Sequence, residues 1–338
     1  MLRSAPLAIR LARASLVAFA ALSAHAVSAH ARPAQWAAFA VPTEQRSEAV
    51  GGYAQGCLLG GVAAPEKGTG FETIRRSRGH YFGHAATVEF VERYGKAMAA
   101  VGQLPVLIGD LSQPRGGPMP TGHRSHQSGL DVDVWFSRPA PDNRRKDKGF
   151  PSLVDERRER VVASVFRPEH AQMLKLAAED PAVARVFVGW VIKRELCATV
   201  EGDRAWLRKI RPWFGHTRHF HVRLECPSGS AGCQTQMPMP EGDGCGQETW
   251  FSRAEVLARR AEPPTPRGRP PKRHPMPSRC ATLLAAGRGG GKGSATASAK
   301  GGAKGGAKGG AKASAKGGGG KAGKPARASK SRRGEGAR

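Results

Sequence analysis

Apolar residues recur with two different periods in the middle of the chain, which predicts both helices and strands. Between residues 87 and 101 they follow helical spacing, and Gly102 then acts as a stop signal. Pro168 suits the first position of a second helix, expected over 169–179. Asp203 suits the N-cap of a third helix, expected to run to Ile210.

Short apolar or alternating stretches predict the strands. They lie at 105–109, 130–136, 184–188 and 220–224. Residues 111–121 include three prolines and two glycines and must form a loop. Because helices and strands mix without regular βαβ spacing, the pattern predicts an α+β fold with an antiparallel central sheet and flanking helices.

Histidine and aspartate gather on two of these strands. In the strand from 130, Asp131 and Asp133 share one face, and His126 lies in the loop that opens it. In the strand from 220, His219 and His221 point the same way, while Phe220 enters the core. Two imidazoles about 6–7 Å apart favour one metal ligand and one neighbouring base.

Together these groups offer two histidines and one carboxylate, which is the three-ligand set of a catalytic zinc site with a fourth position left for water. The alternatives are a solvated acidic face and a pair of surface histidines. Within the sequence there is no G-x-S-x-G, no H-E-x-x-H and no phosphate-binding glycine loop followed by Lys-Ser/Thr.

Charge is concentrated at the C-terminal end. The 338 residues carry 54 Lys/Arg and 27 Asp/Glu, a net charge of +27, and residues 287–338 contribute 14 basic residues against one acidic. The motif Gly-Gly-Ala-Lys occurs three times in succession there. Such a segment cannot bury enough apolar surface to fold, so we expect a disordered basic tail. It binds an anionic polymer (wall glycan, teichoic or lipid phosphate, or nucleic acid) or is a solvated tail without a specific partner.

The N-terminal end predicts export. Three arginines, an apolar run from Ala14 to Leu22 and the Ala29-His30-Ala31 cleavage motif indicate a signal peptide over 1–31, with Ala24-His25-Ala26 as a rival cleavage site. No apolar run reaches the roughly 20 residues of a membrane span. We therefore expect a folded domain over 32–286, with a Pro-rich strap at 262–280, and the tail over 287–338.

Cysteine usage agrees with an oxidising compartment. There are six cysteines and no C-x-x-C, which favours three disulfides over a zinc ribbon and allows fifteen pairings. Cys226 and Cys233 close a short loop and form the pair that locality favours. A bond between Cys57 and Cys280 would tie the strap back to the start of the domain.

Four longer segments carry a resemblance to a known family. They closely resemble the penicillin-insensitive murein endopeptidases, of the lysostaphin, D-Ala-D-Ala metallopeptidase and hedgehog fold group, over about residues 34–284. The segments are Tyr81–His84, Val106–Asp110, Gly122–Asp133 and Trp206–Leu224.

The resemblance implies a periplasmic zinc metallopeptidase that hydrolyses D-alanyl–diaminopimelyl cross-links of peptidoglycan and is insensitive to β-lactams. It implies His126, Asp133 and His221 as zinc ligands. His219 matches the histidine that assists the water and the transition state, and His216 matches a further active-site histidine.

The resemblance also implies three disulfides and raises a question about a second metal. The pairs would be Cys57–Cys280, Cys197–Cys245 and Cys226–Cys233. Members of the family can hold a second metal through the histidine that matches His123, but the other two matching positions fall on Arg160 and near Arg157. Since arginine cannot bind a cation, we expect one Zn²⁺. His123 then orients a ligand or binds substrate, unless Asp155 or Glu156 completes a second site.

Two rival functions and a set of substrate-binding arginines complete the predictions. An exported polycationic protein that binds wall or nucleic acid would use the tail, and a zinc D,D-carboxypeptidase or dipeptidase would use the same metal ligands. The arginines expected to bind stem-peptide carboxylates are Arg115, Arg124, Arg208, Arg211 and Arg218.

Overall fold

The computed structural model describes residues 33–103, 105–137, 150–261 and 275–289. The expected signal peptide and the tail beyond residue 289 lie outside these residues, as does most of the expected strap. Contacts divide the chain into two units, Met1–Lys292 and Gly293–Arg338, and every described residue belongs to the first.

Six α-helices and three short 3₁₀ helices are described. The α-helices are α1 Pro33–Ala37, α2 Ala85–Ala100, α3 Pro168–Glu179, α4 Trp190–Thr199, α5 Arg253–Ala261 and α6 Ser278–Gly289. The 3₁₀ helices are η1 Arg76–Arg78, η2 Ala205–Lys209 and η3 Glu248–Phe251. None of the helices in the described residues has the length and apolar character needed to cross a membrane.

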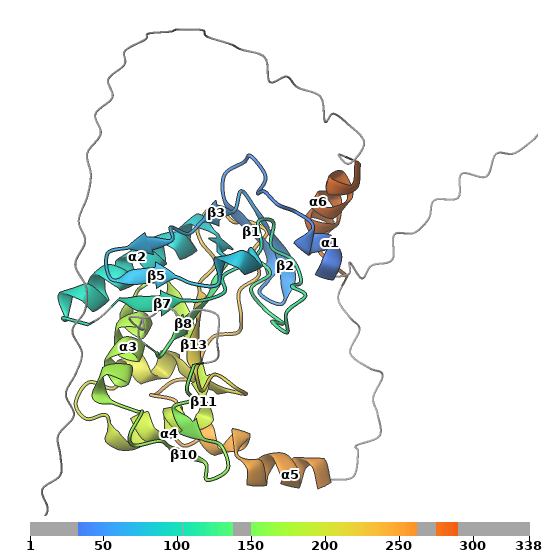
Figure 1. The fold of residues 1–338 in the computed structure, drawn as a ribbon. Helices are drawn as coiled ribbons and strands as arrows, with labels where there is room; N and C mark the ends of the chain where they lie inside the picture. Colours follow the sequence, from blue (N-terminus) through green and yellow to red (C-terminus); the bar gives the residue numbers. More distant parts are fainter. Residues whose placement is uncertain (1–32, 104, 138–149, 262–274, 290–338) are drawn as a thin grey trace, which may run out of the picture. The chain divides into compact units, whose positions relative to one another are not determined.

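The strands form one large sheet and three two-stranded sheets. In chain order they are β1 Glu48–Gly52, β2 Gln55–Leu59, β3 Val62–Ala63, β4 Lys67–Gly68, β5 Phe71–Thr73, β6 Phe82–Gly83, β7 Val106–Ile108, β8 Asp131–Trp135, β9 Val154–Asp155, β10 Arg160–Val161, β11 Val183–Gly189, β12 Ile210–Trp213 and β13 His219–Leu224. The large sheet has seven strands in the order β12-β11-β13-β8-β7-β5-β4 (Figure 1).

The large sheet is mixed, so the expectation of an antiparallel sheet is wrong at two places. Strand β12 runs parallel to β11, and β7 runs parallel to β5. A helix separates each of these pairs in the chain, α4 for the first and α2 for the second. A crossover through a helix returns the chain in its original direction, which makes the pairing parallel.

The predicted elements lie close to the observed ones, with two differences in type. Helices α2 and α3 and strands β7, β8, β11 and β13 occupy the predicted segments, and Pro168 begins α3. The helix expected from Asp203 is instead the 3₁₀ helix η2, whose N-cap is Arg204. It is short because strand β12 begins at Ile210. Helix α6 begins at Ser278, inside the segment expected to be an extended strap, and ends at Gly289.

The two faces of the large sheet differ sharply in chemistry. On one face Val132 and Phe220 are fully buried against helices α2 and α3, where the rings of Tyr94 and Phe220 lie 6.4 Å apart. The Tyr94 hydroxyl donates a 3.0 Å hydrogen bond to the carbonyl of Met173 in α3. The opposite face, here called the site face, carries polar and aromatic residues at alternate positions. They are Asp131, Asp133, Trp135, Arg185, Phe187, Arg211, Trp213, His219, His221 and Arg223.

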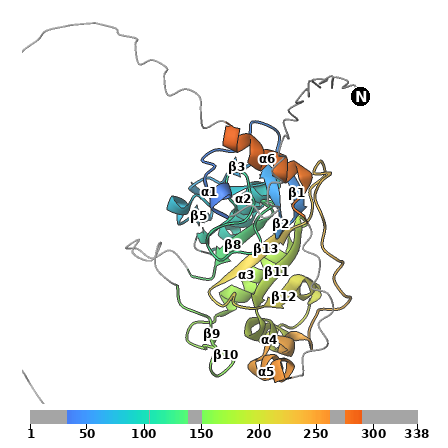
Figure 2. The ribbon, with the colours of Figure 1, turned by 90° about the vertical axis from the view of Figure 1, so that its right-hand side faces the viewer.

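A second, smaller core joins the two ends of the folded domain. It contains Trp36 of α1, Cys57 of β2, and Leu283 and Leu284 of α6, all buried. Figures 1 and 2 both show α6 beside α1 and the β1–β2 hairpin. A disulfide between Cys57 and Cys280 links residues 223 positions apart, and the other two disulfides join Cys197 to Cys245 and Cys226 to Cys233.

Candidate metal centre

A cavity of about 890 Å³ opens on the site face. Strands β8 and β13, the loop before each of them, and strand β11 line it. All six of the predicted histidine and aspartate site residues contribute to its wall: His123, His126, Asp133, His216, His219 and His221. Segments about ninety residues apart in the sequence therefore meet here because β13 pairs with β8, with His221 directly opposite Asp133.

The loop before β8 holds His126 in a strained conformation. Its φ angle is 70°, a left-handed value that is uncommon for residues other than glycine. The backbone N–H of His126 donates to Asp131 Oδ2 at 2.9 Å, and that of Gln127 donates to the Tyr53 carbonyl at 3.0 Å. These bonds fix the loop so that the buried imidazole faces Asp133. Strain of this kind is typical of functional sites.

Three side chains bring potential metal-ligand atoms together. His123, His126 and Asp133 each offer one ligand atom, and these atoms lie within 4.8 Å of one another. Both ring nitrogens of His126 are buried and make no well-aligned hydrogen bond to any described residue, and the buried Oδ1 atom of Asp133 has only the histidine nitrogens of His221 and His126 beside it, at 3.1 and 3.5 Å. Burying polar atoms without partners is costly. A bound cation would satisfy them, so the donor set fits a divalent metal such as zinc.

His221 approaches the same carboxylate. Its Nδ1 atom lies 3.1 Å from Asp133 Oδ1, and its ring centroid lies 4.6 Å from that of His126. Its other nitrogen, Nε2, lies 3.2 Å from Asp131 Oδ1. Metal-ligating histidines commonly have a carboxylate beside their second nitrogen, which fixes the ring orientation. Asp131 is itself bound by Arg223 through contacts of 2.7 and 3.0 Å.

His123 is held in a similar way. Its Nε2 atom lies 3.1 Å from Asp110 Oδ2, while its Nδ1 atom lies 3.7 Å from Asp133 Oδ2. Asp110 is buried and also contacts His80 and Arg78. Asp110, which follows directly on the buried strand predicted at 105–109, was not among the predicted site residues.

The residues considered for a second metal lie elsewhere or are already paired. Asp155 accepts hydrogen bonds from the Arg158 side chain at 2.9 Å and from the backbone of Arg157 and Arg158. Glu156 accepts a 3.4 Å bond from the Thr217 hydroxyl. Across the described ranges, only the His123 group brings three such ligand atoms within 4.8 Å of one another.

His219 and His216 complete the histidine cluster. His219 Nε2 lies 3.7 Å from Asp133 Oδ2, and the His219 ring lies 5.1 Å from that of Trp135. The His216 ring lies 5.2 Å from that of His219, and its Nδ1 atom is 2.8 Å from the Phe214 carbonyl. Because a carbonyl only accepts, Nδ1 of His216 carries the proton and Nε2 is left as a proton acceptor.

Burial and neighbouring charge divide the histidines into two groups. Burial lowers the pKa of His126 and of His219, and it lowers the pKa of His216 to about 3 with help from His221 and His219. Burial also opposes charge on His221, but Asp131 and Asp133 outweigh it and raise the pKa of His221 to about 9. Burial favours the neutral acid at Asp133 as well, yet His219 and His126 hold its pKa well below the usual value.

Of the five predicted substrate-binding arginines, three bind main-chain carbonyls, one lines the metal-site cavity and one lines a neighbouring cavity. Arg115 lies over the ring of Phe39 and donates to a main-chain carbonyl. Arg208 and Arg218 also donate to main-chain carbonyls, those of Met239 and Pro240 for the first and that of Phe150 for the second. Only Arg124 lines the metal-site cavity, and Arg211 lines a neighbouring one.

The chain is similar to known proteins that all carry the same family name. The family model of the penicillin-insensitive murein endopeptidases matches residues 49–285. A penicillin-insensitive murein endopeptidase of Haemophilus influenzae is 41% identical over 253 residues, covering 72% of this chain and 85% of the relative. One from Klebsiella pneumoniae is 40% identical, covering 80% and 97%, and one from Escherichia coli K12 is 37% identical, covering 79% and 96%.

The match contains every residue of the site described above, from Arg78 to Arg223. The matched segment also contains all six cysteines, which are all paired in the structure. The chain therefore belongs to the family of penicillin-insensitive murein endopeptidases.

Proposed function

We propose that the protein is a zinc-dependent endopeptidase that hydrolyses the D-alanyl–diaminopimelyl cross-links of peptidoglycan. The observation that carries the proposal is the convergence of the ligand atoms of His123, His126 and Asp133 within 4.8 Å of one another on the wall of an open cavity. Such a group suits a cation that must also reach a large substrate. No serine nucleophile is needed, so β-lactams that acylate serine should not inhibit.

His126, Asp133 and His221 would hold the metal, as the family resemblance implies, whereas the three ligand atoms that lie within 4.8 Å of one another belong to His123, His126 and Asp133. A bound zinc ion supplies Lewis-acid chemistry, because it polarises the scissile carbonyl and acidifies water. Catalytic zinc sites commonly use three protein ligands and leave room for water, so three of the four groups would hold the metal and the fourth would serve another role. Asp131 and Asp110 would keep the rings of His221 and His123 in place.

His219 is the proposed proton carrier. Burial lowers its pKa, so at neutral pH it is an uncharged imidazole that accepts a proton during attack on the carbonyl. Once protonated, it donates a hydrogen bond to the developing oxyanion and then a proton to the leaving amine. His216, whose ring lies 5.2 Å from that of His219 and whose Nε2 can accept a proton, is the second candidate for that transfer.

The proposal includes a location and a domain plan. Three disulfides are typical of proteins outside the cytoplasm, and the family's murein substrate lies in the cell envelope. We therefore place the mature protein in the periplasm, after removal of residues 1–31, with a catalytic domain over 32–286. The basic residues 287–338 would retain it on an anionic polymer.

Mass spectrometry of cross-linked muropeptides tests the activity. We expect the purified protein loaded with Zn²⁺ to convert dimers to monomers, chelator to stop the reaction, and added Zn²⁺ to restore it. His126→Ala should be inactive, whereas His170→Gln, a change at a histidine outside the cavity, should be active. Absence of hydrolysis by the zinc-loaded protein would refute the proposal.

The same experiment separates the rival activities. A D,D-carboxypeptidase would release free D-alanine from uncross-linked pentapeptides and leave dimers intact. A polycationic binding protein would show no hydrolysis and would lose its affinity on deletion of 287–338. We expect that deletion to leave hydrolysis of soluble dimers unchanged.

A further inference from the structure

A second cavity, of about 570 Å³, adjoins the metal-site cavity on the site face. The two share Arg185, Phe187 and Trp213 as wall residues. Beyond these, Arg211 of β12, Trp250 of η3 and Gly244 line the second cavity. We call it the arginine groove, defined by these six residues.

The strand register gives the distance between the groove and the metal site. Phe187 of β11 pairs with His221 on one side and with Arg211 on the other. Arg211 therefore lies two strand spacings from His221, or about 10 Å along the sheet. An extended peptide covers that length in about three residues.

The groove is rich in positive charge that the protein does not neutralise. Neither Arg185 nor Arg211 forms an ion pair with a carboxylate of any described residue; Arg185 donates to the Met237 carbonyl. Glu255, at the rim, pairs with Arg259, and Glu225 acts on Arg185 only at longer range. Two neighbouring guanidinium groups without acidic partners are typical of a carboxylate-binding site.

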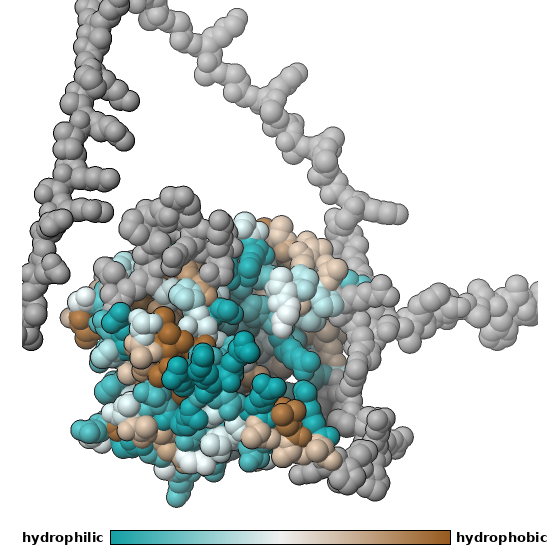
Figure 3. All heavy atoms as spheres, turned by 60° about the horizontal axis from the view of Figure 1, so that its bottom comes forward, coloured by the Kyte–Doolittle hydropathy of each residue, from teal (hydrophilic) through white to brown (hydrophobic). Residues whose placement is uncertain are grey.

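Exposed aromatic rings form the rest of the groove. Trp213 is 51% exposed and Trp250 is 56% exposed, which is unusual for residues of this size. Phe251 lies 5.9 Å from Trp213 and 5.0 Å from Phe214 between ring centroids. Figure 3 shows hydrophobic patches set among hydrophilic surface on the side of the molecule that lies at the bottom of Figure 1.

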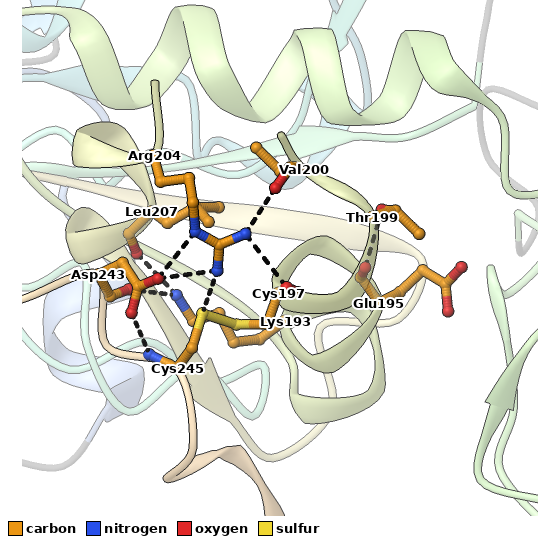
Figure 4. Close-up of a disulfide and its surroundings, with 9 residues drawn as sticks. All are labelled: Lys193, Glu195, Cys197, Thr199, Val200, Arg204, Leu207, Asp243 and Cys245. Carbon is orange, nitrogen blue, oxygen red and sulfur yellow. Dashed lines mark hydrogen bonds and ion pairs between the residues drawn. A yellow bond between two sulfur atoms is a disulfide. The ribbon is translucent and has the colours of Figure 1, made fainter. Parts of the chain in front are cut away.

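The wall that contains Gly244 is firmly anchored (Figure 4). The Cys197–Cys245 disulfide ties it to α4, and the Lys193 ammonium, fully buried, donates to the Asp243 carbonyl at 2.7 Å. Arg204 binds the Asp243 carboxylate at 2.8 and 3.0 Å. Gly244 has a φ of 71°, and a Cβ atom there would lie 2.9 Å from an Arg211 guanidinium nitrogen. The absence of a side chain therefore leaves room for Arg211.

We propose that the arginine groove binds the terminal carboxylate of the stem peptide that carries the diaminopimelyl residue, while Trp213 and Trp250 contact the intervening chain. The proposal rests on the endopeptidase function proposed above. It assigns Arg211 and Arg185 as specificity-determining residues, since the cut peptide would be selected by a charge that Arg211 holds two strands away from His221. Arg185, absent from the residues predicted from sequence, joins Arg211 because β11 lies between the groove and the metal site.

The test compares two synthetic cross-linked dimers that differ only in this terminal group, carboxylate or carboxamide. We expect wild type to have a kcat/KM about 10- to 100-fold higher for the carboxylate. Arg211→Gln and Arg185→Gln should lose that preference through a higher KM for the carboxylate dimer. Arg211→Lys should recover part of the preference. Arg46→Gln, a change at an exposed arginine elsewhere, is the matched control.

Binding to the zinc-free protein supplies a second measurement that does not need turnover. Calorimetric titration with the carboxylate dimer should show affinity that Arg211→Gln weakens by a similar factor, and thermal unfolding checks that the variant is folded. Equal hydrolysis of both dimers by wild type and both glutamine variants would overturn the groove proposal while leaving the endopeptidase intact. If wild type cleaves neither dimer, the proposed function itself fails.

Discussion

At the scale of single residues, the site is a set of histidines whose roles are set by their second contacts. Asp133 lies at the centre, within 3.1 to 3.7 Å of nitrogens from His123, His126, His219 and His221. Two of these rings, His123 and His221, have a second carboxylate beside their other nitrogen, whereas no second carboxylate of a described residue lies beside His126 or His219. The residue types were visible in the sequence, but the contacts that separate ligand from base depend on strand pairing.

Substitution separates a metal ligand from a proton carrier. We expect His126→Ala to lose both bound zinc and hydrolysis, because it removes a donor at the buried centre. His219→Ala should keep zinc and lose about 10²- to 10⁴-fold in kcat, the usual contribution of a general acid–base. Zinc content by atomic absorption and rates on soluble dimers check this. If His219→Ala loses zinc while His221→Ala keeps it, then His219 is the metal ligand and His221 is the proton carrier.

Activity should fall on the acid side. The pKa values of His126, His216 and His219 lie below the ordinary histidine value of about 6.5, so all three are neutral at pH 7. As the pH falls through these values the imidazoles gain protons and can neither bind a metal nor accept a proton. We expect kcat/KM to be constant near pH 7 and to decline below about pH 6. A rate that stays constant to pH 4 would contradict a histidine-ligated metal.

Metal binding at neutral pH should release protons. The nearby carboxylates raise the pKa of His221 to about 9, and Asp110 and Asp133 raise the pKa of His123 despite its burial. A ligating imidazole must be neutral, so zinc displaces about one to two protons at pH 7. Calorimetry in buffers of different ionisation enthalpy measures this number. The number of released protons should fall in Asp131→Asn, because this variant lacks a charge that keeps His221 protonated. An unchanged number in that variant would be evidence against His221 as a metal ligand.

At the scale of elements, strands β8 and β13 form the frame of the site. Asp131 and Arg223 face each other across this pair, both nearly fully buried, and the guanidinium also lies over Tyr53 and Phe187. The ion pair therefore links two strands and supports His221 through Asp131.

Breaking that pair should destabilise the domain. Arg223→Gln leaves the buried Asp131 carboxylate without its main charge partner, and we expect a loss of about 3–5 kcal/mol in the free energy of unfolding. Arg93→Gln is the matched control, since the Arg93–Asp180 pair involves a half-exposed arginine and should cost about 0–1 kcal/mol. Denaturant unfolding followed by circular dichroism compares the two. Similar losses in both variants would contradict the central role of the buried pair.

The strands of the large sheet differ in how well the sequence predicts them. Strands β8 and β13 were predictable because their apolar residues alternate cleanly with Asp131, Asp133, His219 and His221. Strand β12 was not, since it holds Pro212, is only four residues long and directly follows η2. Its parallel pairing with β11 is a long-range contact with no local pattern. Arg185 and the groove were missed for the same reason.

At the scale of the whole molecule, a small hydrophobic core and a disulfide join the N-terminal and C-terminal ends of the described domain. Helix α6 packs on α1 and the β1–β2 hairpin, and the Cys57–Cys280 bond closes a loop of 223 residues. The Cys226–Cys233 bond closes a loop of only 7. In the chain-entropy model a longer loop contributes more stability, because it restricts the unfolded chain more.

Removal of the Cys57–Cys280 bond should reduce the free energy of unfolding more than removal of the Cys226–Cys233 bond. Cys57→Ser with Cys280→Ser should lower the free energy of unfolding by about 5 kcal/mol, and Cys226→Ser with Cys233→Ser by about 2 kcal/mol. Both variants should keep hydrolysis of soluble dimers at temperatures where they are folded, because neither bond touches the metal-site cavity. Thermal unfolding with parallel assays checks both statements, and a larger loss from the short-loop variant would reverse the expected order.

The three disulfides are nested, each shorter loop lying inside a longer one, from 57–280 through 197–245 to 226–233. During synthesis thiols emerge in chain order, and oxidation of neighbours as they appear would join Cys57 to Cys197 and Cys245 to Cys280. Neither of those bonds is present in the structure. Oxidation in this order would therefore form only one of the three native bonds, Cys226–Cys233. If oxidation follows chain order, maturation needs thiol–disulfide exchange, and we expect the yield to depend on an isomerase as well as on an oxidant.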